Sequence, residues 1–154
     1  MKKQKYLEDI YVSTESNLIK KTVEAYSAKA INRPAELCSD GTDKQQVLEH
    51  AIKEIELKVG SVDIICMLQA NSPQLQAAKI DEAIEKVLSD KKTVFECQSV
   101  NENDLITDGA IRVFRRSCLE NKGLGMYLSV VLTDYIDVHT IEDIMAIEKT
   151  LCIK

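Results

Sequence analysis

The chain has 154 residues, of which 45% are hydrophobic, and this is enough to build one core, so we expect a single domain over 1–154. The formal net charge of −5 excludes the basic surplus that a nucleic-acid surface needs. No apolar run reaches the roughly 18–20 residues that cross a bilayer, and the basic first residues are not followed by the apolar stretch of a signal peptide. We therefore expect a cytoplasmic protein with neither a nucleic-acid nor a membrane partner.

The apolar spacing alternates between strand-like and helix-like along the chain. In chain order, the expected elements are a strand at 10–12, a helix over 16–26, a helix over 42–60, a strand at 62–68, a helix from Ser72 through Leu88, strands at 93–97, 110–114, 127–131 and 135–138, and a helix over 140–151. Thr42 with Gln45 forms a predicted capping box, Gly60 ends that helix, and Thr140 caps the last one.

Strand–helix alternation of this kind indicates an α/β fold with βαβ units and a mostly parallel sheet. In such sheets, ligands bind beyond the carboxyl ends of the strands, which selects the segments 13–15, 69–73 and 137–139. Neither a G-x-G-x-x-G nor a G-x-x-x-x-G-K-[ST] segment occurs in the 154 residues, so no glycine-rich phosphate loop is identified.

Two of these features have a ligand-free alternative. Ser72 is expected to cap the next helix, with Pro73 in its first turn. The free backbone N–H groups of that turn either bind an anion or bind no ligand. Arg33 lies in a proline-containing loop and is either a ligand contact or a solvated arginine.

The histidines and cysteines restrict the chemistry. Asp137 and His139 are two apart on an expected strand and would face the same side, but imidazole is not a ligand that Mg²⁺ prefers. His50 is expected to be structural or at the surface, so few Ser–His or Cys–His arrangements can form.

The cysteines have no C-x-x-C spacing and are expected to act as small structural residues: Cys38, Cys66, Cys97, Cys118 and Cys152.

Five blocks in one order resemble motifs of the CMP-sialic-acid synthetases (acylneuraminate cytidylyltransferases). They are Tyr11–Thr14, similar to "VSTD"; Arg33–Asp40, similar to "RPAELAxD"; Leu68–Pro73, similar to "LQPTSP"; Gly109–Phe114, similar to "NGAIYIF"; and Asp137–Asp143, similar to "DIDTEED". The blocks extend over most of the chain, and their common order makes the resemblance specific.

The resemblance implies a Rossmann-like three-layer nucleotidyltransferase that joins CTP to an acidic sugar of the sialic-acid type, for surface polysaccharide or glycan biosynthesis. Pyrophosphate is released and Mg²⁺ is the cofactor. The implied site residues are Arg33 and Thr42 for the nucleotide, Gln69, Asn71, Ser72 and Asp108 for the sugar, and Asp137 and His139 for the metal.

The chain also departs from the family pattern. The family's first strand and its phosphate-binding loop have no counterpart, so we expect an N-terminally truncated chain that also lacks the dimerisation arm, which the family inserts where this chain has only 100–109. His139 replaces the second metal aspartate, and Asp108 replaces an asparagine, where its charge would repel an acidic sugar. We expect an impaired cytidylyltransferase or, alternatively, a non-catalytic nucleotide- or partner-binding module. In either case, a missing strand would expose a sheet edge through which the chain self-associates.

Overall fold

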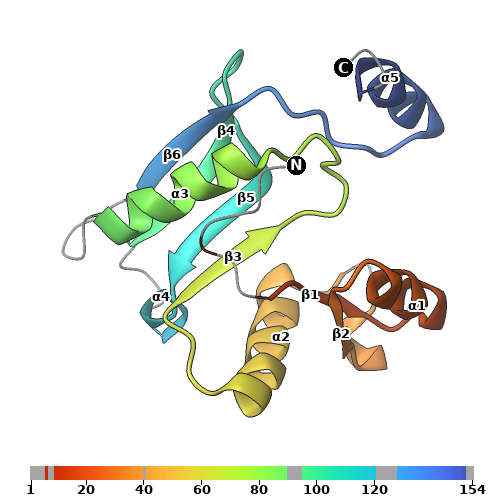
Figure 1. Cartoon of the computed structure of the whole chain (residues 1–154), viewed down its shortest axis with the longest axis vertical. Coiled ribbons are helices and arrows are strands. Elements are labelled where there is room, and N and C mark those ends of the chain that lie inside the picture. The colour runs from red at the N-terminus through yellow and green to blue at the C-terminus, as the bar shows by residue number, and fades with distance from the viewer. Residues whose placement is uncertain (1–5, 7–8, 40, 90–94, 121–127, 152–154) are drawn as a thin grey trace. The chain divides into compact units, whose positions relative to one another are not determined.

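The computed structural model of the chain describes residue 6 and residues 9–39, 41–89, 95–120 and 128–151 (Figure 1). The chain divides into two compact units. The N-terminal unit is Leu7–Val62, and the sheet unit consists of Met1–Tyr6 and Asp63–Lys154. The expectation of a single domain stays a prediction.

The N-terminal unit begins with a strand–helix–strand arrangement. Its elements are β1 (Tyr11–Thr14), α1 (Asn17–Ala25), β2 (Lys29–Asn32), one turn of 3₁₀ helix (Ala35–Leu37) and α2 (Lys44–Val59). Strands β1 and β2 pair in parallel and α1 packs on both, so this part of the chain is a βαβ unit of the kind expected, although strand β2 itself was not predicted. Helix α1 begins after Ser16, whose hydroxyl accepts a hydrogen bond from the backbone N–H of Ile19 at 3.4 Å, because a serine at this position satisfies an otherwise free N–H group.

The start of α2 differs from the predicted capping box, whereas its end agrees. Asp43 caps the helix by accepting a hydrogen bond from the N–H of Gln45 at 2.9 Å. The hydroxyl of Thr42 lies instead 2.7 Å from that of Ser39, so the capping-box prediction was wrong by one residue. Both residues are good caps, and the loop geometry before the helix decides between them. Gly60 ends α2 with a φ of 87°, which a side chain would disfavour.

The sheet unit contains β3 (Ile64–Leu68), α3 (Ala77–Ser89), β4 (Glu96–Asn101), β5 (Thr107–Arg115), α4 (Ser117–Glu120), β6 (Leu128–Thr133) and α5 (Ile141–Leu151). Among the described residues, the strands form one sheet of four in the order β3-β5-β4-β6. The α/β class is confirmed, but the pairing is not mostly parallel: β5 runs antiparallel to both β3 and β4, and only β4 and β6 pair in parallel. The short turn after β4 returns the chain directly, and a direct return can only produce an antiparallel pair.

Two expected elements were misplaced. Residues 135–138 form no strand, because the N–H groups of Ile136 and Val138 bond to the loop after β3 rather than to a neighbouring strand. Helix α3 begins at Ala77 rather than at Ser72, so Ser72 is not its cap. In the strand expected at 93–97, residues 93 and 94 lie outside the described residues, as does Tyr127 of the strand expected at 127–131.

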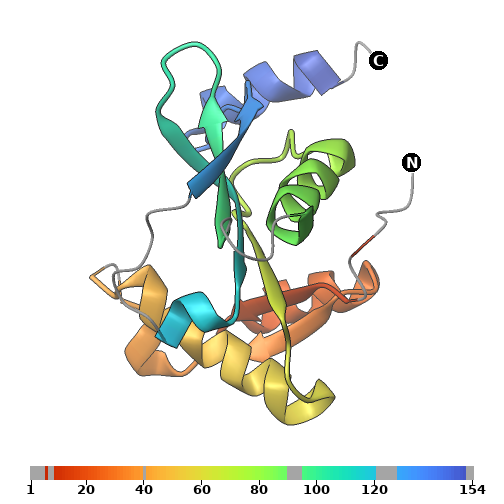
Figure 2. The same ribbon diagram turned by 90° about the vertical axis from the view of Figure 1, so that its left-hand side faces the viewer.

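Helix α3 packs against β4, β5 and β6, and the core of the sheet unit lies beneath it (Figure 2). The core residues of this unit are fully or almost fully buried: Ile80, Ala83, Ile84, Val87, Cys97, Val100, Ala110, Ile111, Val113, Phe114, Val131, Tyr135 and Ile147. Helix α5 has the predicted cap, in which the hydroxyl of Thr140 accepts from the N–H of Asp143 and the Asp143 carboxylate accepts from the N–H of Thr140. Of the described helices, none combines the length and the apolar composition that a membrane span needs.

The described cysteines are free thiols, and Cys152 lies outside the described residues. Burial raises the pKa of the Cys66 thiol to about 12. It also raises the pKa of the Cys97 thiol to about 11. Because a reactive cysteine needs a lowered pKa, these two thiols have the properties of packing residues.

Candidate functional site

The loop after β3 is tied to the segment after β6. We call these the β3 loop (residues 69–76) and the β6 segment (residues 134–139). The N–H of Val138 donates to the carbonyl oxygen of Asn71 at 2.8 Å. The N–H of Ile136 donates to the side-chain oxygen of Gln74 at 2.9 Å. Two of the three segments that the sequence selects therefore meet at one end of the sheet.

A tyrosine that the sequence analysis did not select completes this connection. The hydroxyl of Tyr135 accepts a hydrogen bond from the N–H of Gln76 at 3.0 Å, and its side chain is buried. Burial raises the pKa of the Tyr135 hydroxyl, so the group stays protonated at neutral pH. Its only sequence signal is an aromatic residue in a segment that mixes apolar and polar residues, and that pattern was interpreted as a strand.

Ser72 and Asp137, both predicted site residues, are in direct contact. The Ser72 hydroxyl donates to one Asp137 carboxylate oxygen at 3.1 Å, and Ser72 is only 1% exposed. The other carboxylate oxygen lies 4.0 Å from Nε2 of His139. The side chains of Asp137 and His139 thus lie on the same side as predicted, although the backbone at these residues is not a strand. Ser72 orients the carboxylate, and the exposed imidazole remains at the surface.

The residues at this position fit Mg²⁺ only in part. No group of three His, Cys, Asp or Glu side chains able to hold a metal occurs among the described residues. Mg²⁺ nevertheless binds to many proteins through one or two carboxylates, with waters and substrate phosphates as its other ligands. The oriented and partly exposed carboxylate of Asp137 suits that mode of binding, whereas His139 does not.

Gln69, at the start of the β3 loop, lies over Gly109 of β5. Its backbone N–H donates to the carbonyl oxygen of Ala110 at 3.1 Å. Gly109 has a φ of 71°, and a Cβ added there would lie 2.5 Å from the side-chain nitrogen of Gln69. The carboxamide of Gln69 therefore occupies the space that a side chain at position 109 would fill.

Asp108, beside this contact, accepts hydrogen bonds from three donors. One carboxylate oxygen accepts from the Ser99 hydroxyl and, at 3.0 Å, from the N–H of Ala110. The other oxygen accepts from the Thr133 hydroxyl. Ser99 lies on β4 and Thr133 on β6, and both side chains are buried. The carboxylate thus links three adjacent strands of the sheet.

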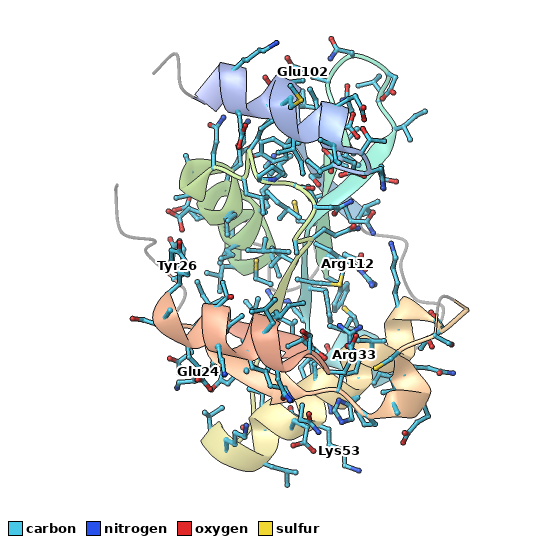
Figure 3. All side chains as sticks on the ribbon, turned by 90° about the vertical axis from the view of Figure 1, so that its right-hand side faces the viewer. Glu24, Tyr26, Arg33, Lys53, Glu102 and Arg112 are labelled. Atoms are coloured by element: carbon cyan, nitrogen blue, oxygen red, sulfur yellow. The ribbon has the colours of Figure 1, made fainter. Side chains whose placement is uncertain are left out.

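The two predicted nucleotide residues lie in the N-terminal unit. The guanidinium of Arg33 donates to the carbonyl oxygen of Ser13 at 2.6 Å and, more weakly, to its hydroxyl at 3.3 Å. Arg33 is therefore half-buried at the carboxyl end of β1 rather than free in solvent (Figure 3). Thr42 lies before α2, with its hydroxyl bonded to Ser39. The remaining predicted site residues belong to the sheet unit.

The family model of the cytidylyltransferases matches residues 1–136. The chain belongs to the cytidylyltransferase family. This confirms the family that the five sequence blocks indicate. The match includes Arg33, Thr42, Gln69 and Ser72, and it ends just before Asp137.

Two similar proteins agree with the family match. N-acylneuraminate cytidylyltransferase B of Danio rerio is 30% identical over 81 residues, which are 53% of this chain and 18% of the relative. The chain thus spans less than a fifth of that cytidylyltransferase's length. The solved structure of CMP:2-keto-3-deoxy-manno-octonic acid synthetase complexed with CTP has a TM-score of 0.73 at 14% identity, over 95% of this chain and 81% of that chain. At this identity, the similarity shows a common fold.

Proposed function

We propose that the chain carries the nucleotide- and sugar-recognition residues for transferring CMP from CTP to an acidic 2-keto sugar of the sialic-acid type. A sugar hydroxyl oxygen would bond to the α-phosphorus of CTP and release its proton to water, the bond from that phosphorus to the β-phosphate oxygen would break, and pyrophosphate would leave. The family match over residues 1–136 carries this proposal. The similarities to an acylneuraminate cytidylyltransferase and to a CMP-sugar synthetase support the acidic-sugar substrate.

The proposed roles follow the chemistry of each side chain. Arg33 and Thr42 would contact the nucleotide, with the Arg33 guanidinium held in place by Ser13. Gln69 would contact the sugar, because a carboxamide can both donate to a carboxylate and accept from a hydroxyl. Asn71 and Ser72 would shape the same side of the site, since their loop is held by the β6 segment.

Asp137 is the proposed ligand of Mg²⁺, and the nucleotide phosphates and water would supply the other oxygens. When bound, Mg²⁺ would offset the negative charge on the phosphates. The chain's own contribution is to aim one carboxylate, which the hydroxyl of Ser72 does by donating to it at 3.1 Å. His139 has no part in this proposal as a ligand.

A non-catalytic binding module is the second candidate function. It is favoured by one observation: the 154 residues contain no glycine-rich phosphate loop. Phosphoryl transfer depends mainly on positioning and charge neutralisation, and a single arginine that acts on the transferred phosphate is worth roughly 10³–10⁵ in rate. We therefore propose that these 154 residues alone bind CTP weakly and make no measurable CMP-sugar.

Calorimetry and a pyrophosphate-release assay on the same preparation test both candidates. CTP is titrated against UTP and ATP, and turnover is measured with CTP plus N-acetylneuraminate or 2-keto-3-deoxy-octonate. Arg33→Ala should weaken CTP binding, whereas Lys53→Ala, which removes an exposed charge from α2 of the same unit, should not. Selective CTP binding without turnover fits an impaired transferase and the binding module alike. Enhancement of CTP binding by the acidic sugar favours the transferase.

Robust turnover would confirm the transferase and refute its impairment. Equal binding of the three nucleotides, or binding of none with no turnover, would refute nucleotide recognition by this chain.

A further inference from the structure

The Asp108–Gly109 segment, near the start of β5, is held by hydrogen bonds on both sides of the glycine although it is only half-buried. Asp108 accepts hydrogen bonds from β4, from β6 and from the N–H of Ala110, so the residue before Gly109 is anchored in three directions. The residue after it is anchored too, because the carbonyl oxygen of Ala110 accepts from the N–H of Gln69 at 3.1 Å. Gly109 itself has a φ of 71°, in the left-handed region that glycine tolerates best.

The backbone of Gln69 is thus fixed relative to residue 110, and its side chain extends back over residue 109. A Cβ on Gly109 would lie 2.5 Å from the Gln69 side-chain nitrogen and 3.5 Å from the carbon that bears it. The first distance is far below van der Waals contact, so the carboxamide and any side chain at position 109 exclude each other. The atom that would have to move is at the end of a flexible side chain, so a side chain at position 109 would change the position of the Gln69 amide.

We propose that Gly109 is a specificity-determining positioning residue, whose missing side chain forms the seat of the Gln69 carboxamide. The part of this inference that concerns sugar binding rests on the proposed function, which assigns Gln69 to the acidic sugar. The part that concerns the position of the Gln69 carboxamide rests on the geometry alone. With the seat intact, the amide is presented in one place. With a methyl group there, the amide is displaced and its hydrogen bonds to the sugar are lost, while the nucleotide residues Arg33 and Thr42 are untouched.

Gly60 supplies a matched control. It also has a positive φ, of 87°, but a Cβ added there meets nothing within 4 Å. Gly60→Ala therefore also places a side chain at a positive φ, but without a steric conflict with another side chain. The contact with Gln69 is then tested directly, by the signals of its own amide and by a double variant.

The first measurement does not depend on function. The side-chain amide signals of ¹⁵N-labelled protein are recorded by NMR, and Gln69 is assigned from the pair of signals that disappears in Gln69→Glu. We expect this pair to shift in Gly109→Ala and to stay in place in Gly60→Ala. An unmoved pair in Gly109→Ala, or the same shift in both variants, would overturn the seat.

The second measurement covers a variant that folds poorly. If the methyl group conflicts with the carboxamide, adding Gln69→Ala should raise the melting temperature of Gly109→Ala. A double variant that melts as low as Gly109→Ala would refute the conflict. Coupling of this kind is expected only between residues in contact.

The third measurement tests the sugar. N-acetylneuraminate is titrated into the wild type and the variants in the presence of CTP. We expect Gly109→Ala to weaken sugar binding by about tenfold, the loss of one or two hydrogen bonds, and CTP binding to be unchanged. Unchanged sugar binding in Gly109→Ala would refute the specificity role. If the amide signals shift but the wild type binds no acidic sugar, the seat stands and the proposed function fails.

Discussion

The carboxylate of Asp108 should be a main anchor of the sheet unit, and its replacement by alanine should be strongly destabilising. Two of its three donors have a second acceptor nearby: the Ser99 hydroxyl lies 3.3 Å from the carbonyl oxygen of Ile111, and the Thr133 hydroxyl 3.3 Å from that of Val100. The N–H of Ala110, a buried residue, would lose its 3.0 Å bond to the carboxylate.

The magnitude follows from these contacts. A buried donor that loses its acceptor costs about 1–3 kcal/mol, and hydrogen bonds to charged groups contribute about 1.5–3 kcal/mol each. Because both hydroxyls can turn to a weaker acceptor, we expect Asp108→Ala to lose about 2–4 kcal/mol in total. At about 2–4 °C per kcal/mol, the melting temperature should fall by roughly 5–15 °C.

Asparagine should be tolerated at the same position. Its oxygen keeps the bonds from Ser99 and Ala110, and its amide group can donate to the Thr133 hydroxyl, which then donates to the carbonyl oxygen of Val100. We expect Asp108→Asn to lose less than about 1 kcal/mol. The family pattern described above has asparagine at this position, which agrees with the expectation that asparagine satisfies the same hydrogen-bonding groups.

Thermal melts followed by circular dichroism give the comparison, with Asp104→Ala as the control. Asp104 lies in the exposed turn between β4 and β5 and also accepts from a backbone N–H, that of Ile106 at 2.9 Å. The same chemical change at this exposed site should have a small effect. If Asp108→Ala melts within a few degrees of Asp104→Ala, or if asparagine is as harmful as alanine, the anchoring argument is wrong.

The remaining predictions concern the metal, the sheet edge and the thiols. Asp137→Ala should weaken Mg²⁺-dependent nucleotide binding with the fold intact, and His139→Asp should strengthen it; calorimetry in which both variants match the wild type would remove the metal assignment. The chain should self-associate through an exposed strand edge, and β6 is one of the two edge strands of the four-stranded sheet that the described residues form; a monomer independent of concentration in the ultracentrifuge would contradict this. Cys66 and Cys97 should resist a thiol reagent at pH 8 in the native state and react on unfolding; rapid labelling of the native protein would contradict this. The pKa of the Cys97 thiol is raised to about 11 in the folded state, so the contribution of this protonated thiol to stability is complete below pH 8.5, roughly the pKa of an unfolded thiol, and is lost as the pH rises toward 11. In thermal melts over this pH range, the melting temperature of Cys97→Ala should therefore fall less than that of the wild type.

The sequence by itself determined the family and most of the element order. Helix and strand periods are local properties, so β1, α1, β3, α3 and α5 can be recognised from the spacing of apolar residues. The capping boxes show how far this reasoning extends. Thr140 was predicted correctly because its partner Asp143 lies three residues away, whereas for α2 two adjacent residues could serve and only the loop geometry selects Asp43.

Only the tertiary structure decided what the site residues contact. Ser72 was predicted as a helix cap, but it donates to Asp137, which lies 65 residues away in the sequence. The expected strand at 135–138 failed for the same reason, since its N–H groups bond to the β3 loop rather than to a strand. The seat of Gln69 on Gly109 likewise joins two strands that are adjacent in the sheet but separated in the chain. Local spacing predicts which residues share an element, but contacts between distant loops depend on strand order, and strand order is fixed by the packing of the whole sheet.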